Sequence, residues 1–243
     1  MAIAHTLKIS QSFSANNQPY TTTATLTSQA NALYLAAASW SGTTLRTFTS
    51  LVHNAGTNPL TFVKVGDRTS NTVATPLSRL VSCRALKANA SSAGTCTITL
   101  SGTVSRLSLI ISEFTGVDTS GTDGSGALLQ TAVNNAVNAA ASMNLTFAAL
   151  GSSNNRLWAA GESDTTTTFT PDGNYVEIAD TNPGEVNSME TQWDNGSGDL
   201  TCTIDPASAT SDIAGIGHEI VAAAAVPSGN AFPFMLALLG VGS

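Results

Sequence analysis

Hydrophobic and polar residues alternate in short runs along most of the chain. Between residues 95 and 100, for example, Cys96, Ile98 and Leu100 alternate with threonines, which is the period of a strand with one buried face. Clusters of Gly, Asn, Asp, Ser and Pro separate the runs. The pattern predicts strands at Thr6–Ser14, Tyr20–Thr27, Ala32–Trp40, Thr47–His53, Leu60–Val65, Leu77–Leu86, Thr95–Leu100, Leu107–Phe114, Ser142–Ala149, Arg156–Gly161, Val176–Ala179, Ser188–Trp193, Leu200–Ile204 and Ile213–Ala222.

One segment departs from this alternation. Ala127–Ala141 is the only stretch with a helical pattern, but Asn134, Asn135 and Asn138 make it a poor helix. We expect it to bridge two halves of a sheet. Strands without intervening helices predict an all-β fold in which two antiparallel sheets pack face to face as a β-sandwich. We assign residues 1–226 to this single domain and residues 227–243 to a C-terminal arm.

Composition supports a β protein and narrows the possible functions. Of the 243 residues only 10% are charged, and Thr, Ser, Asn and Gly take the place of the usual charged surface. This excludes a helical bundle or coiled coil. The pI near 4.7 excludes a protein that binds nucleic acid through bulk positive charge. The sequence contains no run of 18 apolar residues, so no membrane span is predicted. The first residues carry no secretory-signal pattern, which predicts synthesis in the cytoplasm.

Charge is distributed unevenly along the sequence. Eight of the nine basic residues precede residue 113, where only Asp67 opposes them, so that part carries +7. From Glu113 onward fifteen acids face one base, Arg156, and the charge is −14. Two arrangements remain open. Either the strands of both parts interleave and mix the charges, or the surface is bipolar and complements a neighbouring copy or an acidic partner.

The three cysteines, Cys83, Cys96 and Cys202, lack the spacing of a metal site. Cys96 and Cys202 alternate with apolar residues, which places them on buried strand faces. We expect three reduced core thiols. The alternative is a disulfide between Cys83 and Cys96 across a hairpin.

The sequence shows no recognisable catalytic constellation. His5, His53 and His218 lie near three different strand ends, and no nucleophile elbow, zinc-protease, Walker or dinucleotide motif occurs. Glu185 and Glu190 bracket a turn, but alternate acids on one strand face, as in a glycosidase, are absent. We therefore predict that the protein is not an enzyme.

Two similar loops, Asp118–Gly126 and Asp194–Asp199, and one aromatic residue are candidates for ligand binding. The oxygen-rich segment from Asp118 to Gly126, with Asp118 and Asp123, suits Ca²⁺, although it lacks the spacing of an EF-hand loop. Solvated turns are the simpler interpretation, so no cofactor is assigned. Trp193 is the best candidate for a platform on which a sugar ring stacks. The alternative is that it fills the end of the sandwich.

The C-terminal arm gives the stronger functional indication. After the joint Ser228–Asn230, residues 231–243 carry no charge. An apolar segment left in water favours aggregation, so it must be covered by its own sandwich or by another subunit; we favour the second. The predicted interaction residues are Phe232, Phe234, Met235, Leu236, Leu238 and Leu239.

Residues Leu107–Asp118, preceded by the predicted Cys83–Leu100 hairpin and followed by Gly198–Ile204 and Ile213–Ala222, resemble a recurrent β-sandwich domain. It occurs in uncharacterised bacterial exported proteins and in virion proteins of tailed bacteriophages. The exported members usually carry a signal peptide, which favours the phage group here. The resemblance covers residues 5–222 loosely. It implies a jelly-roll-like decoration, head-fibre or tail-fibre protein and supplies no catalytic residues.

We therefore expect a structural virion protein that forms homo-oligomers, contacts other virion proteins and binds neither nucleic acid nor membrane. One alternative is a carbohydrate-binding or adhesin module, with or without calcium, that recognises host-surface glycans. The other is a single jelly-roll coat subunit. Coats that package nucleic acid usually carry a basic arm, whereas residues 1–20 hold only Lys8.

Overall fold

The computed structural model describes residues 2–14, 16, 18–71, 77–184, 187–207 and 211–224. Within these ranges the chain forms strands and one 3-10 turn, η1 (Ser125–Ala127), and no α-helix, so the predicted all-β class is confirmed. The strands are β1 (Ala4–Phe13), β2 (Tyr20–Leu26), β3 (Leu33–Gly42), β4 (Phe48–His53), β5 (Val63–Asn71), β6 (Leu77–Leu86), β7 (Gly94–Leu100), β8 (Arg106–Thr115), β9 (Leu128–Ala140), β10 (Met143–Thr146), β11 (Arg156–Ser163), β12 (Val176–Thr181), β13 (Ser188–Trp193), β14 (Thr201–Ile204) and β15 (Ser211–Ile220).

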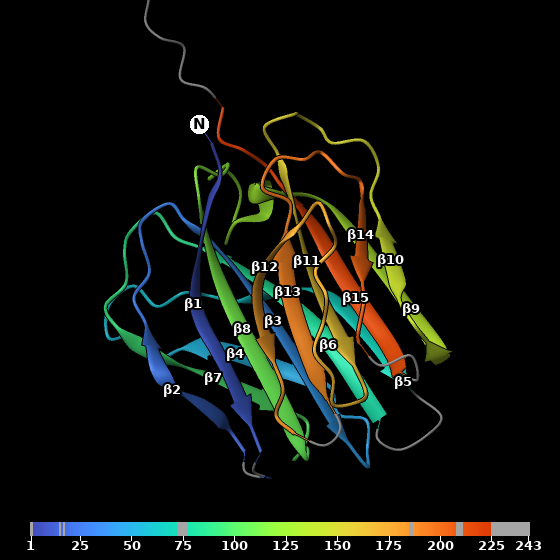
Figure 1. Cartoon of the computed structure of the whole chain (residues 1–243). Coiled ribbons are helices and arrows are strands. Elements are labelled where there is room, and N and C mark those ends of the chain that lie inside the picture. Colours follow the sequence, from blue (N-terminus) through green and yellow to red (C-terminus); the bar gives the residue numbers. More distant parts are fainter. Residues whose placement is uncertain are drawn as a thin grey trace, which may run out of the picture.

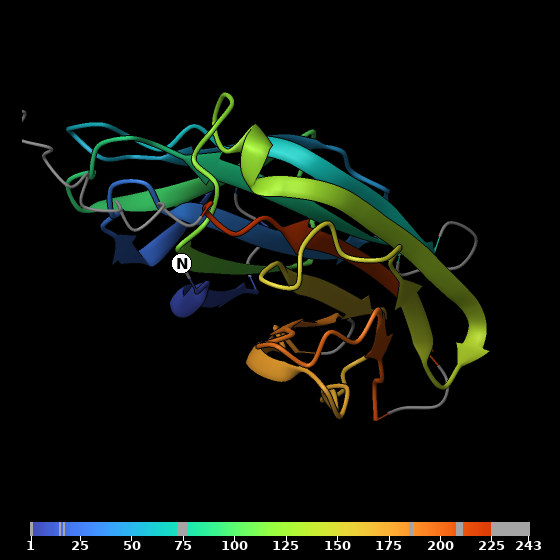
Figure 2. The same cartoon turned by 90° about the horizontal axis from the view of Figure 1, so that it is seen from above.

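The strands form four antiparallel sheets rather than two. Their orders are β2-β7-β4, β1-β8-β3-β6-β5, β12-β13-β11-β15-β9 and β10-β14. In Figure 1 the two five-stranded sheets lie one behind the other. Figure 2 shows the stack from above, with yellow-green β9 beside the teal strands and orange β12 and β13 at the opposite edge. The predicted β-sandwich is thus present as a thicker stack of packed sheets.

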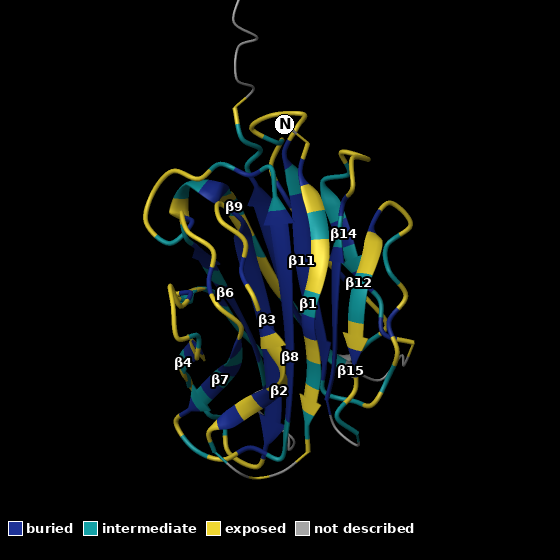
Figure 3. Ribbon diagram, turned by 90° about the vertical axis from the view of Figure 1, so that its left-hand side faces the viewer, coloured by how far each residue is buried: buried dark blue, intermediate teal, exposed yellow. Residues whose placement is uncertain are grey.

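Three apolar cores hold this stack together. The first lies between the three-stranded sheet and its five-stranded neighbour and includes Trp40 and Ile98. The second lies between the two five-stranded sheets and includes Trp158 and Phe114. The third, around Leu145, lies between the other five-stranded sheet and the β10-β14 pair. Central strands β3, β8 and β11 are therefore dark blue in Figure 3, while edge strands such as β1 and β12 carry exposed residues.

The two halves of the chain repeat one strand order. In β1–β8 the large sheet runs β1-β8-β3-β6-β5, and in β9–β15 it runs β9-β15-β11-β13-β12 when counted from its other edge. The pair β2-β7 corresponds to β10-β14. The counterpart of β4 is reduced to a single bridge between Phe169 and Pro206. Each half therefore builds its own sheets. The alternative in which strands of the two parts interleave and mix their charges is wrong.

Register and irregularities repeat as well. Tyr34 pairs with Glu113 in the first half, and Leu157 pairs with Glu219 at the equivalent place in the second. A bulge interrupts β5 between Lys64 and Gly66, and another interrupts β12 at the matching register, between residues 177 and 179. Bulges are specific features of a strand pair, so their recurrence supports a duplicated architecture.

The sequence retains traces of this repeat. The tetrapeptide Thr-Cys-Thr-Ile occurs at residues 95–98 and again at 201–204, a shift of 106 positions. The same shift brings Ile110 onto Ile216 and Glu113 onto Glu219. With a shift of 123, the Ala-Ala pair at 36–37 falls on the pair at 159–160. These shifts agree with the strand registers, which were established independently of them.

The halves face each other through equivalent surfaces, as the two subunits of an isologous dimer do. The middle core contains register-matched pairs from the two sheets: Leu35 and Trp158, Ala37 and Ala160, Leu80 and Met189, Ile110 and Ile216, and Phe114 and Ile220. Strand β5 packs against β9, and β1 packs against β12, which is the equivalent contact. The fold therefore has an approximate two-fold axis between the halves.

Two predicted elements need correction. Residues 128–140 form neither a helix nor a bridge between two halves of a sheet, because they are the edge strand β9 and pair with β15. The strand expected at Leu60–Val65 begins at Val63 and continues to residue 71. The additional strand residues include the charged Asp67 and Arg68, which an edge strand accommodates, since Asp67 pairs there with Arg79.

The cysteines are free and buried, as expected for reduced core thiols. The hairpin that would join Cys83 to Cys96 does not form, because β6 and β7 belong to different sheets. Burial raises the pKa of the Cys83 and Cys96 thiols to about 12 and raises that of Cys202 further.

This burial predicts inert thiols in the native protein. We expect none of the three cysteines to react with a thiol reagent such as Ellman's reagent at pH 8, because the thiolate is both desolvated and inaccessible. All three should react in about 6 M guanidinium chloride, where the core is exposed. Rapid reaction of one thiol in the folded protein would contradict this burial.

Candidate functional site

The two halves cross at one end of the molecule, in a segment pair that we call the crossover (residues 116–118 and 221–223). Val117 and Ala222 form an antiparallel bridge there. The Asp118 amide donates to the Val221 carbonyl at 2.8 Å, and the Ala223 amide donates to the Gly116 carbonyl at 2.8 Å. The last strand of the first half, β8, and the last strand of the second half, β15, are thereby connected at their C-terminal ends across the approximate two-fold axis.

The N-terminus meets the crossover as well. Gly116 has φ +74°, and a Cβ at this position would lie 2.2 Å from the Ala2 carbonyl oxygen. Only glycine therefore fits both the backbone conformation and the close approach. The first described residues and the last, at Ala224, consequently lie at the same pole of the molecule (Figure 1).

Two open hollows flank the crossover. The larger, of about 550 Å³, is lined by Asp118, Gly126, Leu129, Gly151, Ser152, Asn154, Asn155 and Val221–Ala224. The smaller, of about 390 Å³, is lined by Asn31, Gly116–Thr119, Ala223 and Ala224. Matching positions of the repeat recur in the two hollows: Asn154 and Asn31, Ala222 and Gly116, Ala223 and Val117. The repeat thus places related hollows on both sides of the axis.

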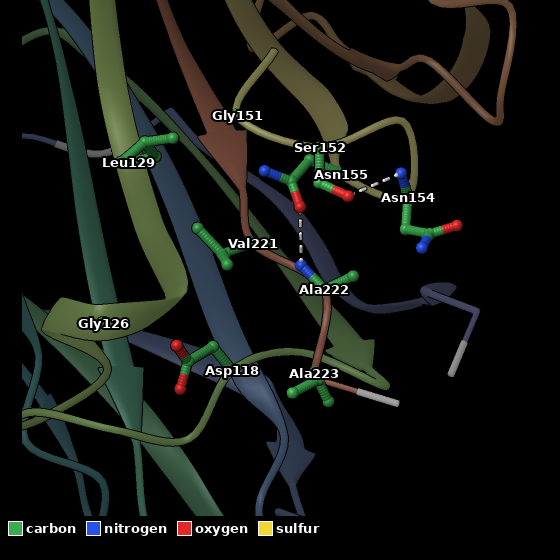
Figure 4. Close-up of a pocket in the computed structure, with 11 residues that line it drawn as sticks. Asp118, Gly126, Leu129, Gly151, Ser152, Asn154, Asn155, Val221, Ala222 and Ala223 are labelled. Carbon is green, nitrogen blue, oxygen red and sulfur yellow. Dashed lines mark hydrogen bonds between the residues drawn. The ribbon is translucent and has the colours of Figure 1, made fainter. Parts of the chain in front are cut away.

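The fully buried carboxylate of Glu219 holds the wall of the larger hollow in place, and Figure 4 shows the residues that line this hollow. Glu219 accepts hydrogen bonds from the Gly151 amide at 2.8 Å, from Asn155 Nδ2 at 2.6 Å and from Gln130 Nε2 at 2.6 Å. Asn155 Oδ1 in turn accepts from the Ala222 amide at 3.0 Å. Glu219 therefore ties the 151–155 loop to the crossover, and a satisfied buried carboxylate of this kind is costly to remove.

The first half uses the matching residue in the same way. Glu113 accepts from Gln29 Nε2 at 3.0 Å and from the Tyr34 hydroxyl, and it pairs with Lys8 at 3.0 Å. Neither glutamate was predicted as a site-positioning residue. Their recurrence after 106 positions is the signal that identifies them.

The chemistry of the larger hollow suits binding. Its lining offers one carboxylate, hydroxyl and amide groups, and an apolar strip formed by Leu129, which is 59% exposed, and the alanines 222–224. Asp118 Oδ1 already accepts from the Ser120 amide at 2.7 Å, which holds the following turn. Such a surface can pair with the backbone and side chains of a docked polypeptide.

The predicted calcium loop follows the crossover but shows no metal-binding geometry. Asp118 stabilises a turn, and Asp123 occupies a left-handed position with φ +48°. Within the part of the chain that the structure describes, no three His, Cys, Asp or Glu side chains are gathered as metal ligands. Calcium binding at Asp118 and Asp123 stays a prediction.

Trp193 lies at the interface between the halves and not on an open platform. The ring is partly buried, with its centroid 5.6 Å from that of His5 and 5.9 Å from that of Phe114. Both partners belong to the first half. The structure thus favours the alternative in which Trp193 fills space within the stack, and glycan binding at this residue stays a prediction.

The three histidines lie apart and are held in neutral form by burial. Burial lowers the pKa of His5 to about 4, and burial together with the nearby Arg84 charge lowers that of His218 to about 3. The pKa of His53 is also lowered by burial, although its hydrogen bond to the Leu26 carbonyl opposes this. Each ring has a separate structural setting.

The predicted interaction residues of the arm, Phe232, Phe234, Met235, Leu236, Leu238 and Leu239, lie outside the described residues, as does Glu185. The described part of the chain contains no helix long and apolar enough to cross a membrane. Comparisons with protein-family models, with curated proteins and with solved structures gave no match.

Proposed function

We propose that this chain is a non-enzymatic structural protein on the surface of a tailed-bacteriophage virion, a jelly-roll-like decoration or fibre component held through its C-terminal arm. The observation that carries the proposal is the position of the chain ends. The described chain begins and ends at the crossover pole, so attachment there leaves the opposite pole of a rigid β stack projecting outward.

The residues that follow this pole have the composition of an anchor. Residues 231–243 contain two phenylalanines, a methionine and three leucines, and they carry no charged side chain. Each large apolar side chain contributes about 1.5–3 kcal/mol when it is fully buried. Five or six of them on another virion subunit suffice to hold the body after the cost of ordering the arm.

Segregated charge supports assembly of several copies. Residues 1–117 carry eight basic and two acidic side chains, a formal charge of +6, while residues 118–243 carry −13. Since each half builds its own sheets, this asymmetry exists in space as well as along the chain. Opposite charges on two faces favour a contact between the first half of one copy and the second half of the next.

Deleting residues 228–243 tests the proposal. We expect the truncated chain to keep its fold, to sediment as a smaller species than the full chain and to be lost from purified particles. Far-ultraviolet circular dichroism provides the control for folding. Unchanged oligomer size together with unchanged incorporation into particles would overturn the anchoring role of the arm.

A further inference from the structure

The repeat allows one charged site in the first half to be compared with its counterpart in the second. In the first half, Asp67 on β5 is surrounded by cations. Arg79 donates to its two carboxylate oxygens, from Nε at 2.6 Å and from Nη2 at 2.8 Å, and Lys64 Nζ lies 2.5 Å from Oδ2. The carboxylate is therefore fully compensated at this position.

The second half keeps the carboxylate and loses both cations. Asp67 pairs with Val81 across β5 and β6, and Asp180 pairs with Glu190 at the same register of β12 and β13. The counterparts of the flanking residues follow from the shared bulge and register: Glu177 stands in the place of Lys64, Ser188 in the place of Arg79, and Glu190 in the place of Val81. A cationic surrounding has thus become an acidic one.

Glu190 is the buried member of this acidic site. The residue is 0% exposed, its Oε1 accepts from Gln192 Nε2 at 3.2 Å, and its Oε2 has no hydrogen-bond partner. Directly opposite cross-strand residues have Cβ atoms about 4.5–5.5 Å apart, and like charges there destabilise a sheet. A buried carboxylate with one unpartnered oxygen, beside a second carboxylate, needs a compensating cation or a proton.

Asp180 provides the open side of the site. It is an exposed residue on the edge strand, and its Oδ2 accepts only from the Phe169 amide, at 3.1 Å, among the bonds of the described residues. The acidic site is therefore open to solvent on the side of the edge strand β12.

We propose that Asp180 and Glu190 bind a divalent cation, Ca²⁺, in the position that the side-chain cations of Arg79 and Lys64 occupy in the first half. Calcium prefers carboxylate and carbonyl oxygens and tolerates irregular coordination. No three acidic side chains of the described residues are gathered around one point, so water completes the coordination shell through the open side. The expected affinity is that of weak extracellular calcium modules, with Kd about 0.1–1 mM.

Calorimetric titration of the full chain with CaCl₂, paired with thermal unfolding in chelator or in about 10 mM Ca²⁺, tests the site. We expect saturable binding and a higher Tm in Ca²⁺, both lost in Glu190→Gln. Glutamine matches the size of the carboxyl group and needs no counter-charge, so this variant should fold. Asp67→Asn, the matched change in the first half, should retain the calcium response.

Two other results would overturn the assignment. The first is an absence of binding or of a Tm shift at this concentration, together with a Glu190→Gln variant as stable as the parent. That outcome means that a proton neutralises Glu190. The second is a calcium response that survives in Glu190→Gln and disappears in an Asp118→Asn, Asp123→Asn double variant, which would locate the ion in the loop after the crossover instead.

Discussion

Replacing Trp158 with alanine is expected to lower the free energy of unfolding by about 3–5 kcal/mol. The side chain is fully buried in the core between the two halves, and its ring stacks on His218 with centroids 5.7 Å apart and an interplanar angle of 8°. Truncation leaves a cavity between the two five-stranded sheets. The closely packed strands around it cannot move enough to fill it. Urea unfolding followed by circular dichroism measures the loss.

Trp193→Ala is the matched control for this prediction. Trp193 contacts the same interface but is only partly buried, so its removal should cost clearly less. A loss below about 1 kcal/mol in Trp158→Ala would contradict tight packing between the halves. Separate unfolding transitions for the two halves would contradict it as well, because a shared core should make them unfold together.

Glu162→Gln should change how stability depends on pH. The Glu162 side chain is fully buried. Burial raises its pKa to about 8, with Asp164 and Asp212 adding to the shift and the Ser70 and Ser78 hydroxyls opposing it. The native state therefore keeps a proton that the unfolded chain releases near pH 4.5.

The sign follows from this difference. Because the folded-state pKa is raised, the neutral carboxyl stabilises the native state most at low pH, and stability falls as pH rises toward 8 at up to about 1.4 kcal/mol per unit. The histidines act oppositely, since their lowered pKa values reduce stability as pH falls below 6.5. Between pH 7 and 8 the decline is therefore due to the buried Glu162 carboxyl group.

Urea unfolding at pH 5, 7 and 8 measures this effect. Glu162→Gln should match the parent at low pH and exceed its stability at pH 8, because glutamine imitates the neutral acid and cannot ionise. Asp123→Asn, which removes one charge from a surface loop, should follow the parent profile. Parallel profiles for Glu162→Gln and the parent would show that this carboxyl does not titrate in the native protein.

Much of the fold could be predicted from local alternation because most strands have one buried face. The ranges Leu77–Leu86 and Ser188–Trp193 were predicted correctly to the residue. Strand β9 was missed since its alanines and asparagines have low strand propensity, and only pairing with β15 stabilises it. The number of sheets could not be predicted from local patterns either. In β3 and in β11 both faces of the strand are buried, and successive side chains point into two different apolar cores.

The site residues were harder to predict for a related reason. Glu219 and Glu190 are isolated acids in the sequence, and their roles arise from the fold. It brings partners 64–89 positions away next to Glu219 and places Asp180 opposite Glu190 on the adjacent strand. A search for internal repeats would have aligned residues 95–116 with 201–222. Such an alignment links Glu113 to Glu219 from the sequence alone.

The position of the first and last described residues, Ala2 and Ala224, near Gly116 also determines how the protein is best labelled. A fluorescent protein or affinity tag fused to Met1 would crowd the pole from which residues 225–243 continue, whereas the exposed turn near Thr43, at the far end of β3, is remote from it. Cargo inserted in that turn would lie at the opposite end of the molecule and leave the crossover pole clear.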